Sequence, residues 1–388
     1  MQRWNSYYGV IKLALLLTYD FLLVIISFFG KSRNQHKVST DVLFIMVPGT
    51  SYLFQDLWAN LRTNRISFEV LEIQHNKFSL QVPRNLLGTG IFGFYALRER
   101  DQVAEVARYS MKYVCSNYHM GIVPSLVKKI TSAPSIFLPH SVIDGTFRYS
   151  NFDYDVYCLF GESSIISLKQ YAGLRMGFVK SKIIGDWRLG ESSRIYGKKE
   201  LHPNRVGFFV NPEISDGGFH EDTFNLFLST VSDSDFIFEI RVHPLMTIDV
   251  VNNKVMSYLG RVPKNLIISD SRKSIINYLT NIFVVVHSYS NASLEAAKLG
   301  IPSILLYPCD LESVNNEFVI NDYLSLRKFF PKYCLTSTSL NERIFEYIGG
   351  LVEDSVIEDF YSFNVHVNGR ENLIKLLSGP ISNTEIND

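Results

Sequence analysis

The sequence predicts an α/β protein made of two domains, each built on a parallel sheet with helices on both faces. Its 388 residues exceed what one hydrophobic core commonly serves, so two cores are expected. Hydrophobic residues make up 46% of the chain and charged residues 20%, a composition typical of globular proteins. Short apolar runs alternate with segments of helix length, which is the order of elements in a doubly wound sheet.

A long apolar segment, 9–30, precedes the globular part. It is long enough to cross a hydrocarbon core at about 1.5 Å per residue. Lys12, Asp20 and Ser27 fall within a helical sector of about 80°, which favours a helix in the membrane interface over a spanning one. Residues 1–37 are therefore predicted to be a membrane-associated helix with a basic flank. This places the protein on the cytoplasmic face of the inner (plasma) membrane, peripheral or monotopic; burial of the segment in the protein is the alternative.

The first domain is predicted over residues 38–190. Its apolar runs end in Gly, Pro or polar residues, as buried parallel strands do. The runs are Val42–Val47, Phe68–Ile73, Ser135–Leu138, Tyr154–Phe160 and Ser181–Ile184, and a helical stretch is expected at Gln102–Cys115. Residues 191–205 carry Gly, Ser, Lys, Arg and Pro with little apolar periodicity, which predicts an interdomain linker.

The second domain is predicted over residues 206–388. Five apolar runs separated by segments of helix length indicate a second Rossmann-like sheet. They are Val206–Asn211, Phe236–Val242, Leu266–Ser269, Phe283–Val286 and Ile301–Tyr307. Two Rossmann-like domains joined by a linker make the GT-B architecture, in which substrates bind at the carboxyl ends of the strands.

The sharpest chemical signal is the segment 287–302, HSYSNASLEAAKLGIP, where an apolar strand breaks into polar residues and then becomes a helix. Its polar candidates are Ser288, Ser290, Asn291, Ser293 and Glu295. The serines and the asparagine are suited to cap the helix while its free N–H groups bind a phosphate, and the glutamate is suited to accept a ribose hydroxyl. Capping without any ligand is the alternative.

A second signal is Arg241-Val242-His243-Pro244, at the end of an apolar run. Strand alternation is expected to point Arg241 and His243 to one side. A guanidinium and an imidazole together bind a phosphate and stabilise the charge that builds on a leaving nucleotide. Ordinary surface positions are the alternative for either residue alone.

These two elements carry a resemblance to known enzymes. RVHP followed by S-x-S-N-x-S-x-E-A-x-x-x-G-I-P resembles the donor-site pair of bacterial surface-polysaccharide glycosyltransferases of GT-B fold. The nearest patterns are those of bacterial sialyltransferases and polysialyltransferases, and of CDP-glycerol glycerophosphotransferases. The match covers about 236–308. Both groups use cytidine-nucleotide donors, so the resemblance implies a nucleotide-linked donor bound by Arg241, His243 and the serine cluster. A CMP- or UDP-linked sugar is the expected donor.

The reaction also needs a base that takes a proton from the acceptor hydroxyl. The segment 138–145, LPHSVIDG, follows an apolar strand and is expected to face the substrate. His140 resembles the histidine base of the glycerophosphotransferases, whereas Asp144 with Gly145 resembles the acidic motif of polysialyltransferases. Histidine suits proton abstraction without much tuning, so His140 is preferred and Asp144 is the alternative. A turn in which both merely bond the backbone also fits.

The expected function is transfer of a sugar from a nucleotide-sugar donor to a hydroxyl of a cell-surface polysaccharide or lipid-linked glycan precursor. Polyol-phosphate transfer from a CDP-glycerol-type donor, epimerisation of a nucleotide sugar and a non-catalytic assembly role are the alternatives. Because Lys+Arg and Asp+Glu are equal at 38 each, no global attraction to nucleic acid is expected. No cofactor besides the nucleotide-sugar substrate is expected, and no metal, because Arg241, His243 and a helix terminus meet the charge of the donor phosphate. Asp153-Tyr154-Asp155 has the D-x-D spelling but lacks the further ligands that a hard cation needs.

Overall fold

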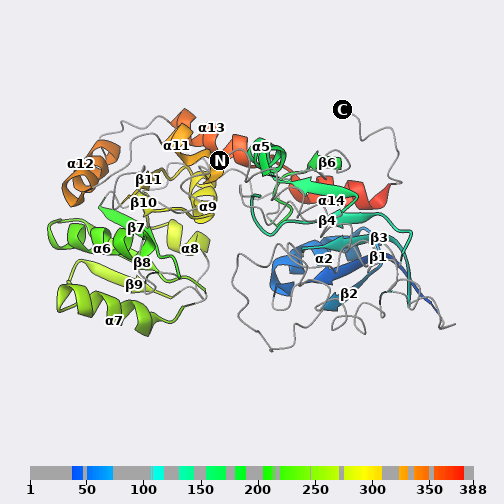
Figure 1. Cartoon of the computed structure of the whole chain (residues 1–388), viewed down its shortest axis with the longest axis horizontal. Coiled ribbons are helices and arrows are strands. Elements are labelled where there is room, and N and C mark those ends of the chain that lie inside the picture. The colour runs from blue at the N-terminus through cyan, green and yellow to red at the C-terminus, as the bar shows by residue number, and fades with distance from the viewer. Residues whose placement is uncertain are drawn as a thin grey trace, which may run out of the picture. The chain divides into compact units, whose positions relative to one another are not determined.

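The chain forms two compact units, each with its own parallel sheet (Figure 1). One unit comprises described residues between 37 and 188 together with 366–379, and the other comprises described residues between 204 and 365. The α/β class with two parallel sheets is therefore confirmed. The computed structural model describes residues 37–46, 50–72, 106, 108–117, 131–143, 154–171, 180–188, 204–212, 214, 219–244, 246–270, 275–307, 323–330, 336–348 and 354–379.

The first unit is built on a six-stranded sheet in the order β2-β1-β3-β4-β5-β6, with every neighbouring pair parallel. The strands are β1 (Val38–Met46), β2 (Phe68–Glu72), β3 (Tyr109–Ser116), β4 (Ser135–Phe137), β5 (Val156–Leu159) and β6 (Lys180–Ile183). The helices of this unit are η1 (Ser51–Phe54), α2 (Gln55–Thr63), α5 (Glu162–Tyr171) and α14 (Gly369–Ser378).

Apolar side chains on the inner strands explain why this sheet forms. The residues Val42–Met46 are almost completely buried, as expected for a strand covered on both faces. Phe44 meets Phe54 and Trp58 from the helical segment that follows the strand, with ring centroids 5.9 and 6.2 Å away. These edge-on ring contacts attach that helical segment to the sheet.

One element of the first unit was predicted wrongly. The stretch Gln102–Cys115 was expected to be helical, but Tyr109–Ser116 forms strand β3, paired in parallel with β1 and β4. Tyr113, Val114 and Cys115 are residue types that pack well on a half-buried or buried strand, and all three are buried. Tertiary pairing with β1 therefore overrides the local helical pattern.

The second unit is built on a five-stranded sheet in the order β11-β10-β7-β8-β9, again parallel throughout. The strands are β7 (Arg205–Phe209), β8 (Ile237–Arg241), β9 (Leu266–Ser269), β10 (Val284–His287) and β11 (Ser303–Leu305). The helices are α6 (Phe219–Ser232), α7 (Ile248–Leu259), α8 (Ile275–Leu279), α9 (Ala292–Lys298), η6 (Tyr323–Ser325), α11 (Leu326–Phe329), α12 (Ser337–Ile348) and α13 (Asp354–Asn364).

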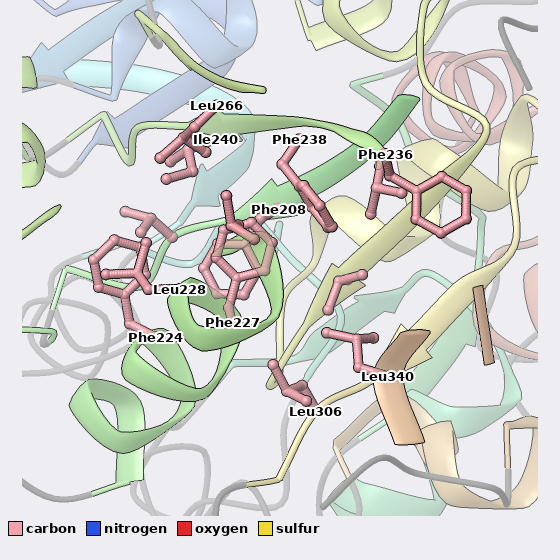
Figure 2. Packing of buried hydrophobic residues seen from close by; sticks show 14 of the residues in the cluster. Phe208, Phe224, Phe227, Leu228, Phe236, Phe238, Ile240, Leu266, Leu306 and Leu340 are labelled. Atoms are coloured by element: carbon pink, nitrogen blue, oxygen red, sulfur yellow. The ribbon is translucent and has the colours of Figure 1, made fainter. Parts of the chain in front are cut away.

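The two faces of this sheet carry different side chains. One face packs against α6, α7 and α12 in an apolar core (Figure 2). In this core the rings of Phe208 and Phe227 stack with their centroids 4.1 Å apart. Phe238 and Ile240 of β8 belong to this core, so the alternating residues Glu239 and Arg241 point to the other face. That other face is covered by α8 and α9. The polar residues of β8 therefore lie on the α8/α9 face.

The C-terminal boundary differs from the expected one. The range 206–388 was assigned to the second domain, but His366 and the described residues after it belong to the first unit. The side chain of Asn372 donates to the carbonyl of Ile184 at 2.9 Å, and the backbone N–H of His366 donates to the carbonyl of Phe160 at 2.7 Å. These contacts join residues about 200 positions apart in the sequence. No local sequence pattern predicts that the end of the chain packs against the first unit.

The predicted membrane-associated helix lies outside the described residues, as do most of the predicted linker residues. Within the described part of the chain, no helix combines the length and the apolar content needed to cross a membrane.

Candidate functional site

The second sheet has a topological switch point between β7 and β10. From β7 the chain continues outward through β8 to β9, and it then returns to the other side of β7 to form β10 and β11. In open parallel sheets, ligands bind outside the carboxyl ends of the strands at such a point. The residues at and just beyond the carboxyl ends of β7, β8 and β10 are therefore the candidates for ligand binding.

Arg241 is the last residue of β8 and is partly buried. Its guanidinium lies over the ring of Tyr278, 5.5 Å from the ring centroid, and the hydroxyl of Tyr278 donates to the carbonyl of Glu239 at 2.7 Å. Burial lowers the pKa of Arg241, and the electrostatic influence of Tyr278, Asp270, Glu295 and Glu239 opposes that shift. Arg241 is thus a positioned and partly desolvated cation, which suits binding of an anion.

His243 lies two residues beyond the end of β8, where its carbonyl accepts a hydrogen bond from the N–H of Met246 at 2.9 Å. Its side chain is partly buried, and burial lowers the pKa of its imidazole. His243 therefore lies in the turn that leads into α7, close in sequence to Arg241 at the same edge of the sheet.

Ser288 follows β10 directly and meets a residue that the sequence interpretation missed. Its hydroxyl is 3.3 Å from Nδ1 of His220, the second residue of α6, and both side chains are buried. Because α6 follows β7, this contact spans the switch point between β7 and β10. The turn sequence Asp-Gly-Gly at 216–218, just ahead of α6, is the signal that could have directed attention to His220.

Of the next three predicted residues, Ser290 and Ser293 stabilise the start of α9 and Asn291 does not. The hydroxyl of Ser290 accepts a hydrogen bond from the N–H of Ala292 at 3.2 Å. Ser293 is fully buried, and its hydroxyl donates to the carbonyl of Ser290 at 2.7 Å. Asn291 makes no side-chain cap; its amide oxygen accepts the hydroxyl of Tyr323 at 2.6 Å instead. The capping alternative thus accounts for the observed contacts of Ser290 and Ser293.

Glu295 lies in the first turn of α9 and is partly buried. It is among the carboxylates whose charge raises the pKa of Arg241, so the two sequence signals lie within electrostatic range of each other. The structure therefore brings together one charged residue from each of the two segments identified in the sequence.

His287, the last residue of β10, is a further polar residue at this edge. It is completely buried, and neither of its ring nitrogens has a hydrogen-bond partner among the residues that the structure describes. Burial lowers the pKa of the imidazole to about 3, so the ring is neutral at physiological pH. Alternation with Val286, which faces the apolar core, places His287 on the α8/α9 face.

In the first unit, His140 lies in the turn that follows β4. Its carbonyl accepts a hydrogen bond from Nη1 of Arg188 at 2.7 Å, and the carbonyl of Pro139 accepts one from Nε1 of Trp187 at 3.1 Å. The side chain of His140 is partly buried. Asp144, the alternative base, lies outside the described residues. Trp187 and Arg188 were not identified as site residues from the sequence.

Among the described residues, no group of three or more His, Cys, Asp or Glu side chains is arranged to hold a metal ion. Asp155 accepts hydrogen bonds at 2.8 Å from both the N–H and the hydroxyl of Ser135, which is a structural use of its carboxylate.

Comparison with known proteins gives structural matches only. No family model and no curated protein matches the sequence. The structure is similar to that of HepE from Anabaena in complex with UDP and glucose, with a TM-score of 0.51 and 14% identity over 88% of this chain and 100% of that one. It is similar to MnaA of S. aureus with UDP, with a TM-score of 0.55 and 10% identity over 86% of this chain and 95% of that one.

The wall teichoic acid polymerase TagF is a further match, with a TM-score of 0.54 and 11% identity over 95% of this chain and 97% of that one. At these identities the matches establish the fold alone. The chain has the two-sheet, Rossmann-like GT-B fold that these proteins share.

Proposed function

We propose that the chain is a glycosyltransferase that moves a sugar from a nucleotide-sugar donor to a hydroxyl of a cell-surface polysaccharide or lipid-linked glycan precursor. The observation that carries the proposal is the set of basic and hydroxyl side chains at the switch point of the second sheet. Arg241 lies there with a carboxylate, Glu295, in electrostatic range, and His220 and Ser288 meet across the strands. This combination suits a ligand with both phosphate and ribose groups.

In the proposed donor site, Arg241 and His243 bind the phosphates of the nucleotide. They stabilise the negative charge that develops as the bond between the anomeric carbon and the phosphate oxygen breaks. Glu295 accepts a hydrogen bond from a ribose hydroxyl. Ser288, oriented by His220, donates a further hydrogen bond to a phosphate oxygen.

In the proposed acceptor site, His140 takes the proton of the acceptor hydroxyl while that oxygen forms its bond to the anomeric carbon. The nucleotide leaves with the electron pair of the broken bond. Asp144 remains the alternative base. No cofactor enters this scheme, and the charge of the leaving group is met by the Arg241 guanidinium and a hydrogen bond from His243 rather than by a metal ion.

The matched structures support this proposal through the ligands with which they were solved. HepE is described with UDP and glucose, and MnaA with UDP. The membrane surface is a proposed partner because of the apolar segment 9–30, which would bring the enzyme to lipid-linked acceptors on the cytoplasmic face of the inner membrane.

Two other activities have a specific observation behind them. TagF is named a wall teichoic acid polymerase and one of its structures was soaked with CDPG, which supports polyol-phosphate transfer with the same phosphate and base residues. A UDP-GlcNAc 2-epimerase from Neisseria meningitidis bound to UDP-GlcNAc also matches, with a TM-score of 0.53 and 12% identity over 88% of this chain and 98% of that one. Epimerisation would need no glycan acceptor.

The test begins with a thermal-shift screen against CMP, CDP, UDP, GDP and their common sugar conjugates. A ligand of the native state raises the apparent melting temperature. We expect a selective shift with one nucleotide family, reduced in His243→Ala. Product analysis with that donor then separates sugar transfer, polyol-phosphate transfer and epimerisation. If no nucleotide shifts the melting temperature, the chain is a non-catalytic assembly partner and the proposal is wrong.

A further inference from the structure

The turn that carries His140 is held by its main chain. The carbonyl oxygens of Pro139 and His140 both accept hydrogen bonds from side chains of the segment that follows β6, namely Trp187 and Arg188. The imidazole of His140 takes no part in these two bonds. The backbone from which the imidazole projects is therefore held by residues 48 positions away.

Arg188 itself is tightly oriented. Its Nε and Nη2 atoms donate to the two carboxylate oxygens of Asp186, at 2.8 and 2.6 Å. The guanidinium also lies over the ring of Phe160, 5.0 Å from the centroid. A bidentate pair fixes the plane of the guanidinium, so Nη1 can point at only one region, and it meets the carbonyl of His140 there.

The segment that carries Asp186 and Arg188 is bound in turn by the C-terminal part of the chain. Arg370 is only 8% exposed, and its Nη2 atom donates to the carbonyl of Arg188 at 2.7 Å. Gly185 has a φ of +95°, and a Cβ atom built there would lie 2.3 Å from the carbonyl oxygen of His366. The backbones of the two segments thus approach as closely as glycine allows.

Stability alone does not explain this network. Removing two guanidinium groups and a carboxylate from water is costly, and apolar residues of similar volume often serve a fold equally well. What paired charges add is a fixed direction for each hydrogen bond. That direction is transmitted from Arg370 to Arg188 and then to the carbonyl of His140, beside the proposed reacting group.

We propose that Arg188 is a positioning residue for His140, oriented by Asp186 and anchored by Arg370 of the C-terminal segment. The inference rests on the proposed function, since it gives His140 the role of base. It adds that the C-terminal segment contributes to catalysis without contacting substrate. A base misplaced by about 1 Å loses on the order of 100-fold in rate, which sets the scale of the expected effect.

The test compares Arg188→Ala, Arg188→Lys, Asp186→Asn and Arg370→Met in the full chain, with donor and acceptor as substrates. We expect kcat to fall by roughly 10- to 100-fold in Arg188→Ala, and less in Arg188→Lys, which keeps one donor but loses the bidentate pair. The Kd of the donor nucleotide should stay within about twofold, because the donor site lies in the other unit. Guanidinium chloride at low concentration should partly restore kcat in Arg188→Ala only.

Arg62→Ala is the matched control. Arg62 lies over the ring of Phe68 in the same unit, 5.1 Å from the centroid, and has no described contact with the turn at 139–140. It should keep the wild-type kcat. The pH profile of kcat/KM supplies a second readout: the acid limb due to the base should persist in Arg188→Ala at a lower plateau and disappear in His140→Ala.

The outcomes distinguish failure of the proposed function from failure of the positioning role of Arg188. A wild-type protein that binds no nucleotide and transfers no group overturns the proposed function. A wild-type enzyme that depends on His140 but keeps its kcat in Arg188→Ala overturns only the positioning role. If Arg188→Ala fails to fold, Arg188→Lys and Asp186→Asn test the positioning role instead. An unchanged kcat in both variants overturns that role. Turnover that survives His140→Ala also overturns it.

Discussion

The two sheets hold their candidate residues in different ways. At the carboxyl edge of the second sheet, Arg241 is the last residue of β8 and Ser288 directly follows β10. At the corresponding edge of the first sheet, the turn of His140 is held by Arg188 and, through it, by Arg370, which come from far along the chain. The donor-side candidates are thus local to their strands, whereas the acceptor-side candidate depends on tertiary contacts.

This difference predicts two kinds of mutational behaviour. Substitutions on the second sheet should change ligand affinity by removing a group that touches the ligand. Substitutions around the turn of His140 should change turnover or stability while donor affinity stays the same.

The largest effect is expected for His140→Ala. Loss of a general base lowers kcat on the order of 100- to 10,000-fold, while the donor Kd should change by less than about twofold. His243→Ala should show the reverse, a donor Kd weakened by roughly 10-fold as a charged phosphate contact is lost. Steady-state kinetics and calorimetric titration with the donor nucleotide measure both. Ser141→Ala controls for change in the turn itself, and a full-rate His140→Ala enzyme would transfer the role of base to Asp144.

The next effect concerns stability. Gly185→Ala should destabilise the first unit by at least about 3 kcal/mol, because the new Cβ atom collides with the carbonyl of His366 and the φ of +95° strains any side chain. Gly260, at the end of α7, also has a positive φ, of +71°, but a Cβ atom there has nothing within 4 Å. Gly260→Ala should therefore cost only about 1 kcal/mol.

Urea unfolding separates the two glycine variants by unit. Of the three tryptophans, Trp58 and Trp187 belong to the first unit and Trp4 lies outside the described residues, while the second unit's range 204–365 contains none. Tryptophan fluorescence therefore does not follow the second unit, whereas far-UV circular dichroism follows both units. Equal losses in the two variants would show that the approach of the C-terminal segment to Gly185 is not a tight contact.

The same difference decides what could be predicted from the sequence. The strands of the second sheet were predicted to within two residues, because buried parallel strands are continuous apolar runs bounded by breakers. Arg241 was found because it lies at the end of such a run, and Ser288 because it comes shortly after one. The strand β3, the contact of Arg188 with His140 and the return of the C-terminal segment were missed, since each depends on a partner distant in sequence. His220 was missed because the helix that carries it begins ten residues after the end of β7 rather than directly at a strand end.

A smaller effect is a pH dependence confined to the second unit. His287 has a pKa of about 3 in the folded state and about 6.5 when unfolded, so between these values the unfolded chain binds a proton that the folded chain does not. Stability is therefore complete above about pH 6.5 and declines as the pH falls toward 3, with a loss of about 2 kcal/mol already at pH 5. His287→Leu should remove this loss.

Hydrogen exchange of the β10 amides at pH 7 and pH 5, corrected for intrinsic rates, measures this difference. Comparing wild type with His287→Leu cancels the other titrating groups, including His243, whose pKa burial also lowers. If the two proteins lose the same stability between pH 7 and pH 5, His287 is hydrogen-bonded or solvated in solution.

The smallest effect is expected at the contact across the switch point. His220→Asn should weaken binding of a nucleoside diphosphate by roughly 5- to 10-fold, about 1 kcal/mol, because Ser288 loses the partner that orients its hydroxyl toward a phosphate. Affinity for the matching nucleoside, which lacks phosphates, should not change. Thr223→Val is the control, since its hydroxyl is used within α6 on the carbonyl of Phe219. A parallel loss for nucleoside and diphosphate would instead mean that His220 supports the shape of the whole site, and the contrast between ligand contact in the second sheet and indirect support in the first would no longer hold.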